Sequence, residues 1–218
     1  MVFFFTPRGH GPGPDDWLLY MGVDKYENED LIKYSLPTDV WFHVDALSSA
    51  HVYLRLPEGK SMGDIPKDTL EDACQLVKAN SIVGNKQNNL AIVYTPASNL
   101  RKSSDMAVGQ VGFHSDALVK KAHVARRLNE IVNRLNKTQV EKFPDLAAEK
   151  MAWEKEQTGK RKAESTAQRR TEKEEKDEQK RQQDMLDYKH IMREESMVTA
   201  GELREKYETA EDYEDDFM

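Results

Sequence analysis

The stretch that decides the fold is Asp39-Val-Trp-Phe-His-Val-Asp-Ala-Leu-Ser-Ser-Ala-His-Val-Tyr-Leu-Arg55. Side chains alternate over residues 40–44 and again over 51–56, and alternation of this kind has the period of a β-strand. Small residues at 48–50 separate the two halves. The stretch therefore predicts two neighbouring strands. The first has Trp41 and His43 on one face, and the second has His51, Tyr53 and Arg55 on one face.

Periodicity elsewhere predicts a single compact α+β domain of mixed or antiparallel strands with two packed helices. Further strands are expected at 1–6, 17–21, 90–95, 108–114 and up to about 124. A short acidic helix or turn is expected at 26–31. The two packed helices are expected at 66–79 and 125–137. For the first of these, Asp64 is the predicted cap and Pro66 stands in the first turn.

The carboxy-terminal third has a different composition. Residues 146–193 are rich in Ala, Glu, Lys, Gln and Arg, which favour helix. Sustained apolar heptad positions are lacking, which favours a long solvated helix with Glu–Lys pairs over a packed coiled coil. Residues 194–218 carry ten acidic and two basic residues and are expected to form a disordered acidic tail. The predicted organisation is a domain at 1–145, a charged helical segment at 146–193 and a tail at 194–218.

Charge is unevenly distributed within the predicted domain. Residues 1–77 contain 6 Lys and Arg against 13 Asp and Glu, whereas residues 78–142 contain 11 against 4. A concentrated basic segment favours an anionic partner, of which nucleic acid is the commonest. A soluble charged surface is the alternative interpretation.

Several classes of protein are excluded by what the sequence contains. The single cysteine, Cys74, rules out an intramolecular disulfide framework and a cysteine-based zinc finger, and a helical pattern around it predicts a buried thiol. No apolar run approaches the ~18 residues of a membrane-spanning helix. Val2–Phe5 is too short for the core of a signal peptide. These features favour a cytoplasmic location, with the nucleus also open.

Catalysis is not predicted. His43 and His51 lie near Asp45 and Ser48, but a Ser–His–Asp site also needs an activated serine and an oxyanion donor pair. No Gly-x-Ser-x-Gly motif is present, and a zinc site would need further ligands. We therefore expect no catalytic residue, metal or cofactor, and histidines that hydrogen-bond internally or contact RNA.

Cationic side chains and one polar strand face are the predicted nucleic-acid contacts. Arg127 and Arg134 are seven residues apart, which places them on one face of the predicted helix. Tyr53 shares its strand face with His51 and Arg55 and is expected to be exposed for base stacking, whereas Trp41 is expected in the core. The full set is Lys86, Arg101, Lys102, Lys120, Lys121, Arg126, Arg127, Arg134, His51, Tyr53 and Arg55.

Several motifs in order resemble the NFACT-R domain. They are residues 39–55, Leu76–Ser81, Val93-Tyr94-Thr95 with Asn99-Leu-Arg-Lys102, and Val108–Phe113, and the match extends over about 1–140. Met21-Gly22, 24–32 and 142–149 are similar to the small stand-alone branch of that family. The resemblance implies an RNA-binding module. In multidomain relatives this module accompanies domains that bind tRNA and the large ribosomal subunit in quality control of stalled translation.

The sequence thus predicts non-catalytic RNA binding, with tRNA or ribosomal RNA as the partner in translation. Two alternatives remain open. One is a protein-interaction adaptor that works through residues 146–193, and the other is DNA binding through the same cations.

Overall fold

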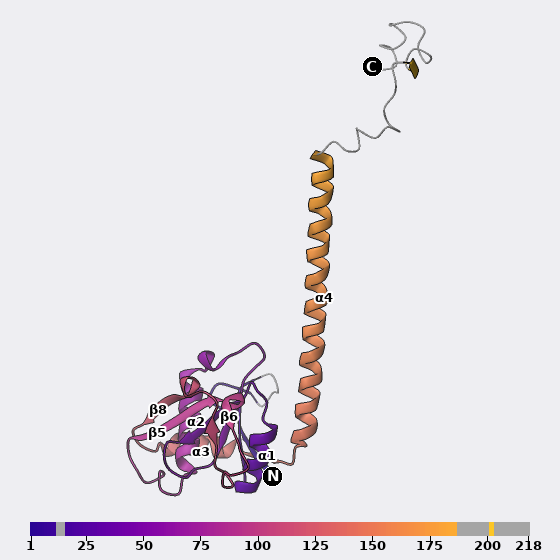
Figure 1. Ribbon diagram of the computed structural model, residues 1–218. Coiled ribbons are helices and arrows are strands. Elements are labelled where there is room, and N and C mark those ends of the chain that lie inside the picture. Colours follow the sequence, from indigo (N-terminus) through magenta and orange to yellow (C-terminus); the bar gives the residue numbers. More distant parts are fainter. Residues whose placement is uncertain (12–15, 187–200, 203–218) are drawn as a thin grey trace. The chain divides into compact units, whose positions relative to one another are not determined.

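A seven-stranded antiparallel sheet forms the centre of the fold in the computed structural model, which describes residues 1–11, 16–186 and 201–202 (Figure 1). The strand order is β8-β5-β3-β4-β2-β1-β9, so that β8 and β9 are the two edges. Its strands are β1 (Val2–Phe5), β2 (Leu18–Gly22), β3 (Val40–Val44), β4 (Val52–Arg55), β5 (Leu90–Pro96), β8 (Lys120–Val124) and β9 (Val140–Lys142). The predicted pair β3 and β4 is central, with Trp41 opposite Tyr53.

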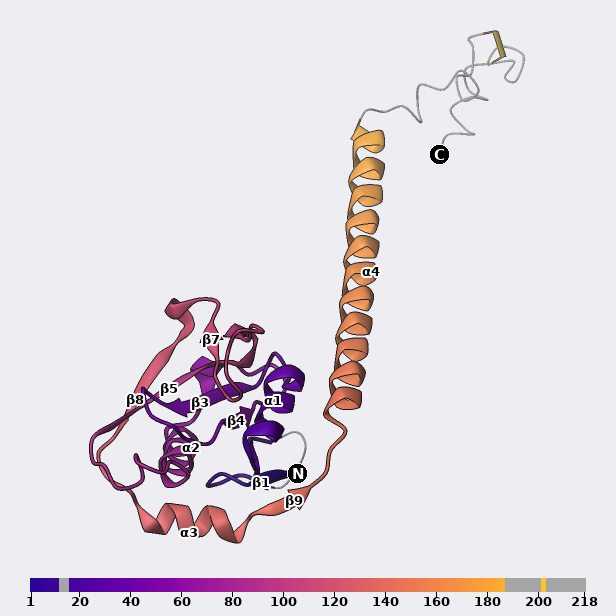
Figure 2. The ribbon, with the colours of Figure 1, turned by 60° about the horizontal axis from the view of Figure 1, so that its bottom comes forward.

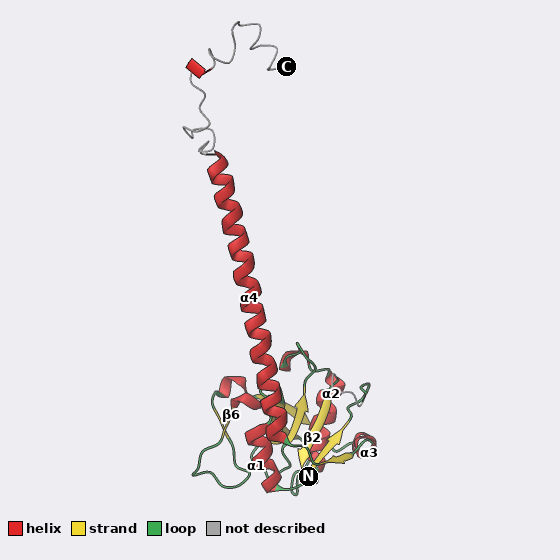
Figure 3. Cartoon of the chain, turned by 90° about the vertical axis from the view of Figure 1, so that its right-hand side faces the viewer, coloured by secondary structure: helices red, strands yellow, loops and turns green. Residues whose placement is uncertain are grey.

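The remaining elements are a small hairpin and the helices (Figure 3). The hairpin pairs β6 (Leu100–Arg101) with β7 (Gly112–Phe113). The helices are α1 (Lys25–Tyr34), α2 (Lys67–Ala79), α3 (Asn129–Lys137) and α4 (Leu146–Leu186), with single 3-10 turns at Met62–Asp64, Ala97–Asn99 and Asp116–Leu118. Residues 1–156 form one compact unit, and a second begins at Gln157. No described helix has both the length and the apolar character that crossing a membrane requires.

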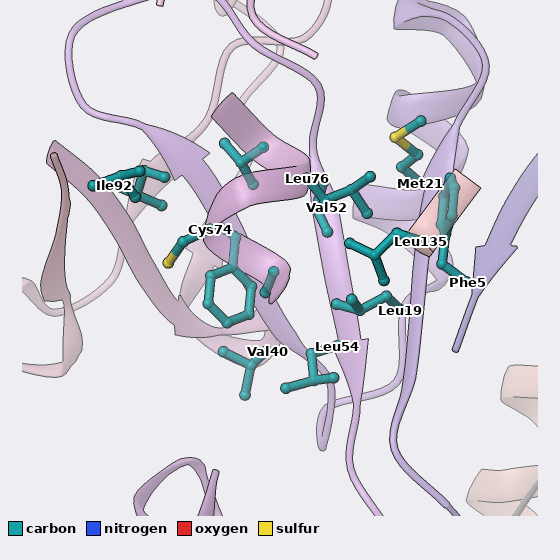
Figure 4. Packing of buried hydrophobic residues seen from close by; sticks show 14 of the residues in the cluster. Phe5, Leu19, Met21, Val40, Val52, Leu54, Cys74, Leu76, Ile92 and Leu135 are labelled. Atoms are coloured by element: carbon teal, nitrogen blue, oxygen red, sulfur yellow. The ribbon is translucent and has the colours of Figure 1, made fainter. Parts of the chain in front are cut away.

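Helices α2 and α3 cover one face of the sheet. Cys74 and Leu76 of α2 and Leu135 of α3 pack against Val52 and Leu54 of β4 (Figure 4). Alternate residues of each strand point to this face, and the apolar arc of α2 recurs at helical spacing, so both patterns bury the same core.

The opposite face is covered as well. Tyr20, Trp41 and Tyr53 pack there with Leu31 of α1, and Phe113 of β7 lies against this cluster. Both faces of β3 and β4 are therefore buried, although one face of each is polar or aromatic in the sequence.

The α+β class, the antiparallel sheet with packed helices and the long carboxy-terminal helix are confirmed. Several boundaries were wrong. The strand expected at 108–114 is only β7. The acidic helix at 26–31 is the longer α1, and Pro66 is the N-cap of α2 while Asp64 closes a capping box with Ser61.

Two further differences concern the chain after β8 (Figure 2). Helix α3 begins at Asn129 and not at 125, because the buried side chain of Gln75 binds the Arg126 carbonyl and the Leu128 N–H and keeps the link out of the helix. Strand β9 was not predicted, since its three residues are all exposed and carry no apolar alternation. Residues 187–193 and the predicted acidic tail, except 201–202, lie outside the described residues.

Candidate nucleic-acid interface

The strand face that was expected to contact RNA is buried. Tyr53 has no exposed surface and stacks on Tyr20 with ring centroids 5.0 Å apart. Its hydroxyl has no hydrogen-bond partner among the described residues. The prediction that Tyr53 is an exposed stacking residue is therefore wrong, because α1 and the β6–β7 region cover this side of the sheet. The expectation that Trp41 lies in the core is confirmed.

Arg55 is occupied by an internal ion pair. Its Nε lies 3.3 Å from Oδ1 of Asp39, which is itself wholly buried and accepts hydrogen bonds from the Tyr20 hydroxyl at 2.5 Å and the Leu36 N–H at 3.0 Å. Burial by itself lowers the pKa of Arg55, but the Asp39 carboxylate outweighs it and raises that pKa above its usual value. Arg55 therefore supports the fold and is not available for phosphate.

Burial disfavours the charged form of both histidines. The Trp41 indole N–H donates to Nδ1 of His51 at 3.0 Å, so this nitrogen carries no proton. Burial, with a smaller contribution from His43, lowers the pKa of His51 to about 4. Nδ1 of His43 lies 2.7 Å from the Val44 carbonyl, and burial lowers its pKa also. Within the described chain, no three His, Cys, Asp or Glu side chains are grouped so that they could hold a metal ion.

The sheet separates the predicted cations into two groups. Lys86, Arg126 and Arg127 lie where β5 begins and β8 ends, and we name these three residues the cationic end. Arg101 and Lys102 follow the other end of β5. Because an antiparallel strand rises ~3.4 Å per residue, the seven residues of β5 separate the groups by roughly 20 Å.

Main-chain and side-chain bonds hold the cationic end in place. The Asn89 N–H donates to the Ala125 carbonyl at 2.8 Å, and Nη1 of Arg127 donates to Oδ1 of Asn85 at 2.7 Å. Lys86 and Arg126 are exposed, and neither forms a salt bridge with another residue that the structure describes. Two exposed cations without salt bridges to described residues thus flank the paired ends of β5 and β8.

Other predicted contacts have internal partners. Nζ of Lys102 lies 2.8 Å from Oε1 of Glu29 and also donates to the carbonyls of Ala107 and Gln110, which folds the loop after β6 onto α1. Burial by itself raises the pKa of Glu29, but the hydrogen bond from Lys102 and other favourable interactions outweigh it, so that the pKa is lowered. Lys121 pairs with Asp45 at 2.6 Å on the surface.

Arg134 packs on α2 and does not share a helix face with Arg127. Its Nη2 lies 2.5 Å from Oδ1 of Asp72, whose side chain is 1% exposed. Arg127 precedes α3, so the predicted common stripe is wrong. Arg101 and Lys120 are exposed, but they belong to the far end of β5, where Lys120 pairs with Tyr94 in the sheet register.

Two buried polar residues of α2, Gln75 and Lys78, were missed. Gln75 positions residues 126–128, and Nζ of Lys78 donates to the carbonyls of Gly84, at 2.8 Å, and Gln87. Burial lowers the pKa of Lys78. The available signal was that Lys78 stands four residues after the core residue Cys74, on the arc where an amphipathic helix carries apolar side chains.

A groove of about 610 Å³ lies between α2 and the open edge at β8, with Lys67, Leu70, Gln75, Ala122 and Arg126 among its lining residues. Cys74 also lines it, and burial raises the pKa of this thiol to about 12, so it is a poor nucleophile. The predicted buried Cys74 is confirmed. Arg126 of the cationic end is thus one of the residues that line this groove.

Comparisons with known proteins show the family to which this chain belongs. A family model described as "NFACT protein RNA binding domain" matches residues 1–115. The chain is similar to Coiled-coil domain-containing protein 25 of Bos taurus, with 51% identity over 90% of this chain and 94% of the relative. For the protein of that name from Mus musculus the identity is 56% over 79% and 82%, and for that from Danio rerio 59% over 72% and 74%. The chain belongs to the NFACT RNA-binding domain family.

Proposed function

We propose that this protein binds RNA without catalysing a reaction on it, and that the cationic end supplies its phosphate contacts. The observation that carries the proposal is the pair Lys86 and Arg126, which are exposed, flank the paired ends of β5 and β8 and have no salt bridges to described residues, in a chain whose family model is described as RNA-binding. Lys and Arg that contact phosphate give affinity without reading sequence.

The finer part of the proposal is that the RNA is tRNA or ribosomal RNA, met in the cytoplasm during translation or rescue of stalled ribosomes. Its support is the resemblance of residues 39–55 and 93–102 to NFACT-R domains that accompany tRNA- and ribosome-binding domains. The absence of catalysis is supported by His43 and His51, whose Nδ1 atoms are occupied by Val44 and Trp41. Neither is arranged beside an activated serine with an oxyanion donor pair.

Fluorescence anisotropy with the full chain tests the proposal. The probes are a labelled tRNA, a ribosomal RNA hairpin and a DNA duplex of similar length. Lys86→Glu with Arg126→Glu should weaken RNA binding by about tenfold or more. The plot of log affinity against log salt should also become shallower, by about one unit for each phosphate that the variant no longer neutralises.

The matched control is Arg101→Glu with Lys120→Glu, which makes the same change in net charge at the far end of β5. This control should bind within about twofold of the parent after the salt dependence is taken into account. Equal weakening in both double variants would show that only net charge matters. Equal affinity for duplex DNA would support the DNA alternative, and partner capture by residues 146–218 with no RNA binding would support the adaptor.

A further inference from the structure

The loop between α2 and β5, residues 81–89, presents apolar side chains to solvent beside the cationic end. Ile82 is 85% exposed and Val83 is 49% exposed. The rest of the loop carries Lys86 and four amide side chains, and contains no acidic residue. The amides are Asn85, Gln87, Asn88 and Asn89.

This loop is built from inside the protein. Nζ of the fully buried Lys78 binds the carbonyls of Gly84 and Gln87. The Gly84 N–H donates to Oγ of Ser81 at 3.0 Å, and that hydroxyl donates to the Ser48 carbonyl at 2.7 Å. Polar groups of α2, of the loop itself and of the β3–β4 connection thus form hydrogen bonds that hold this one surface loop in place.

Packing fixes the loop further. A Cβ at Gly84 would lie 2.8 Å from Oγ of Ser81 and 2.9 Å from Cδ2 of Leu90, so the backbone sits directly on its neighbours. The Asn85 N–H donates to the Ser81 carbonyl at 3.2 Å, which is the spacing of a helical turn. The Lys86 and Gln87 N–H groups donate three residues back, to the Val83 and Gly84 carbonyls at 3.2 Å, so Ile82 and Lys86 are held on one short run of tight turns.

We propose that this loop is a preformed wedge that packs Ile82 against an unpaired or terminal base of RNA while Lys86 and Arg126 bind the flanking phosphates. The inference rests on the proposed RNA binding and narrows it to RNA with unpaired bases. Specific recognition of RNA is directed mainly at loops, bulges and ends. Isoleucine is among the apolar side chains that proteins in the minor groove of DNA insert between base steps, which unstacks the bases.

Charge and polarity favour RNA over a lipid surface. The exposed amides of Gln87, Asn88 and Asn89 can donate to and accept from base edges. On entering a bilayer the same amides would be stripped of their hydrogen bonds to water, at a cost for each group. The exposed Lys86 and Arg126 of the cationic end can bind RNA phosphates.

An RNA hairpin with a single-base bulge tests this inference, with 2-aminopurine placed next to the bulge and a fully paired hairpin of the same length for comparison. The parent should bind the bulged RNA roughly five- to tenfold tighter than the paired one. Its binding should raise 2-aminopurine fluorescence, because the probe becomes unstacked. Ile82→Ser should abolish both the preference and the fluorescence rise while it keeps the salt dependence, which comes from phosphate contacts.

The control is Phe143→Ser, which removes an exposed apolar side chain just after β9, near the opposite edge of the sheet. It should behave as the parent. If Ile82→Ser binds RNA with the parent's preference and fluorescence change, the wedge is overturned while RNA binding stands. If the parent binds neither RNA, both proposals fall. If Ile82→Ser affects only binding to vesicles that contain phosphatidylserine, Ile82 is a lipid contact and the wedge is overturned.

Discussion

Asp39 and His51 show at the scale of single residues how the polar strand face is used. The Asp39 carboxylate receives donors from Tyr20, Leu36 and Arg55, and His51 accepts from Trp41. Both side chains therefore have hydrogen-bond partners inside the fold, as most buried polar groups do. The polar groups of this face thus help to stabilise the sheet.

The depressed pKa of His51 predicts how stability depends on pH. In the unfolded chain histidine titrates near ~6.5, whereas in the folded protein the pKa of His51 is about 4. Above pH ~6.5, His51 is neutral in both the folded and the unfolded chain, so it does not reduce the free energy of unfolding. As the pH falls from ~6.5 towards 4, the unfolded chain binds a proton that the folded protein does not, and the free energy of unfolding decreases by about 3 kcal/mol.

Urea unfolding at pH 7, 5.5 and 4 measures this decrease. His51→Asn should show a smaller fall across that range than the parent, while being less stable at pH 7. The exposed His114→Asn should follow the parent. If the stability of the parent and of His51→Asn falls in parallel, other groups account for the acid sensitivity.

Helix α2 does two tasks at the scale of elements. Its apolar arc covers the sheet. Its buried Gln75 holds the link that carries Arg126, and its buried Lys78 holds the loop that carries Ile82 and Lys86. Removal of a buried donor leaves its acceptors unsatisfied, which costs more than the bond itself contributes. The helix is thus the support on which the proposed RNA surface depends.

We expect Lys78→Met to lower the free energy of unfolding by about 2 kcal/mol, because the carbonyls of Gly84 and Gln87 are left without their donor. Amide hydrogen exchange of residues 81–89 should accelerate, since the internal support of the loop is removed. Lys67→Met changes an exposed lysine of the same helix and should alter stability by no more than ~0.5 kcal/mol. Unchanged exchange in Lys78→Met would show that other interactions hold the loop.

At the scale of the whole molecule, contacts made by the first turns of α4 decide where the compact unit ends. Leu146 packs against the cluster around Tyr20 and Trp41, Glu149 lies 3.6 Å from Arg55, and Lys150 donates to the Lys33 carbonyl. The first turns of α4 therefore belong to the compact unit that extends to residue 156.

A chain ending after residue 156 should melt within a few degrees of the full chain. A chain ending after 145 should still melt cooperatively, but it lacks the Leu146 side chain and the two weak polar interactions of Glu149 and Lys150. We expect it to be about 1 kcal/mol less stable, which lowers Tm by about 3 °C for a domain of this size. Calorimetry of both fragments checks this, and a non-cooperative transition in either would place the folding boundary further along α4.

Local pattern alone determined much of this protein. Alternation over 40–44 and 51–56 predicted the central strands, the apolar arc of 70–77 predicted α2, and motifs in order predicted the family. These features are encoded in near neighbours, because a strand or a helix repeats its environment every few residues.

Only the tertiary structure decided which polar side chains remain exposed and unpaired, and so could contact RNA. Tyr53 is covered because α1 and β7 fold over its face of the sheet, and Arg55 is paired with the buried Asp39. Lys102 is neutralised by Glu29, 73 residues away, whereas Lys86 and Arg126 meet no such partner among the described residues. Burial and ion pairing depend on side chains distant in sequence, and no local period records them.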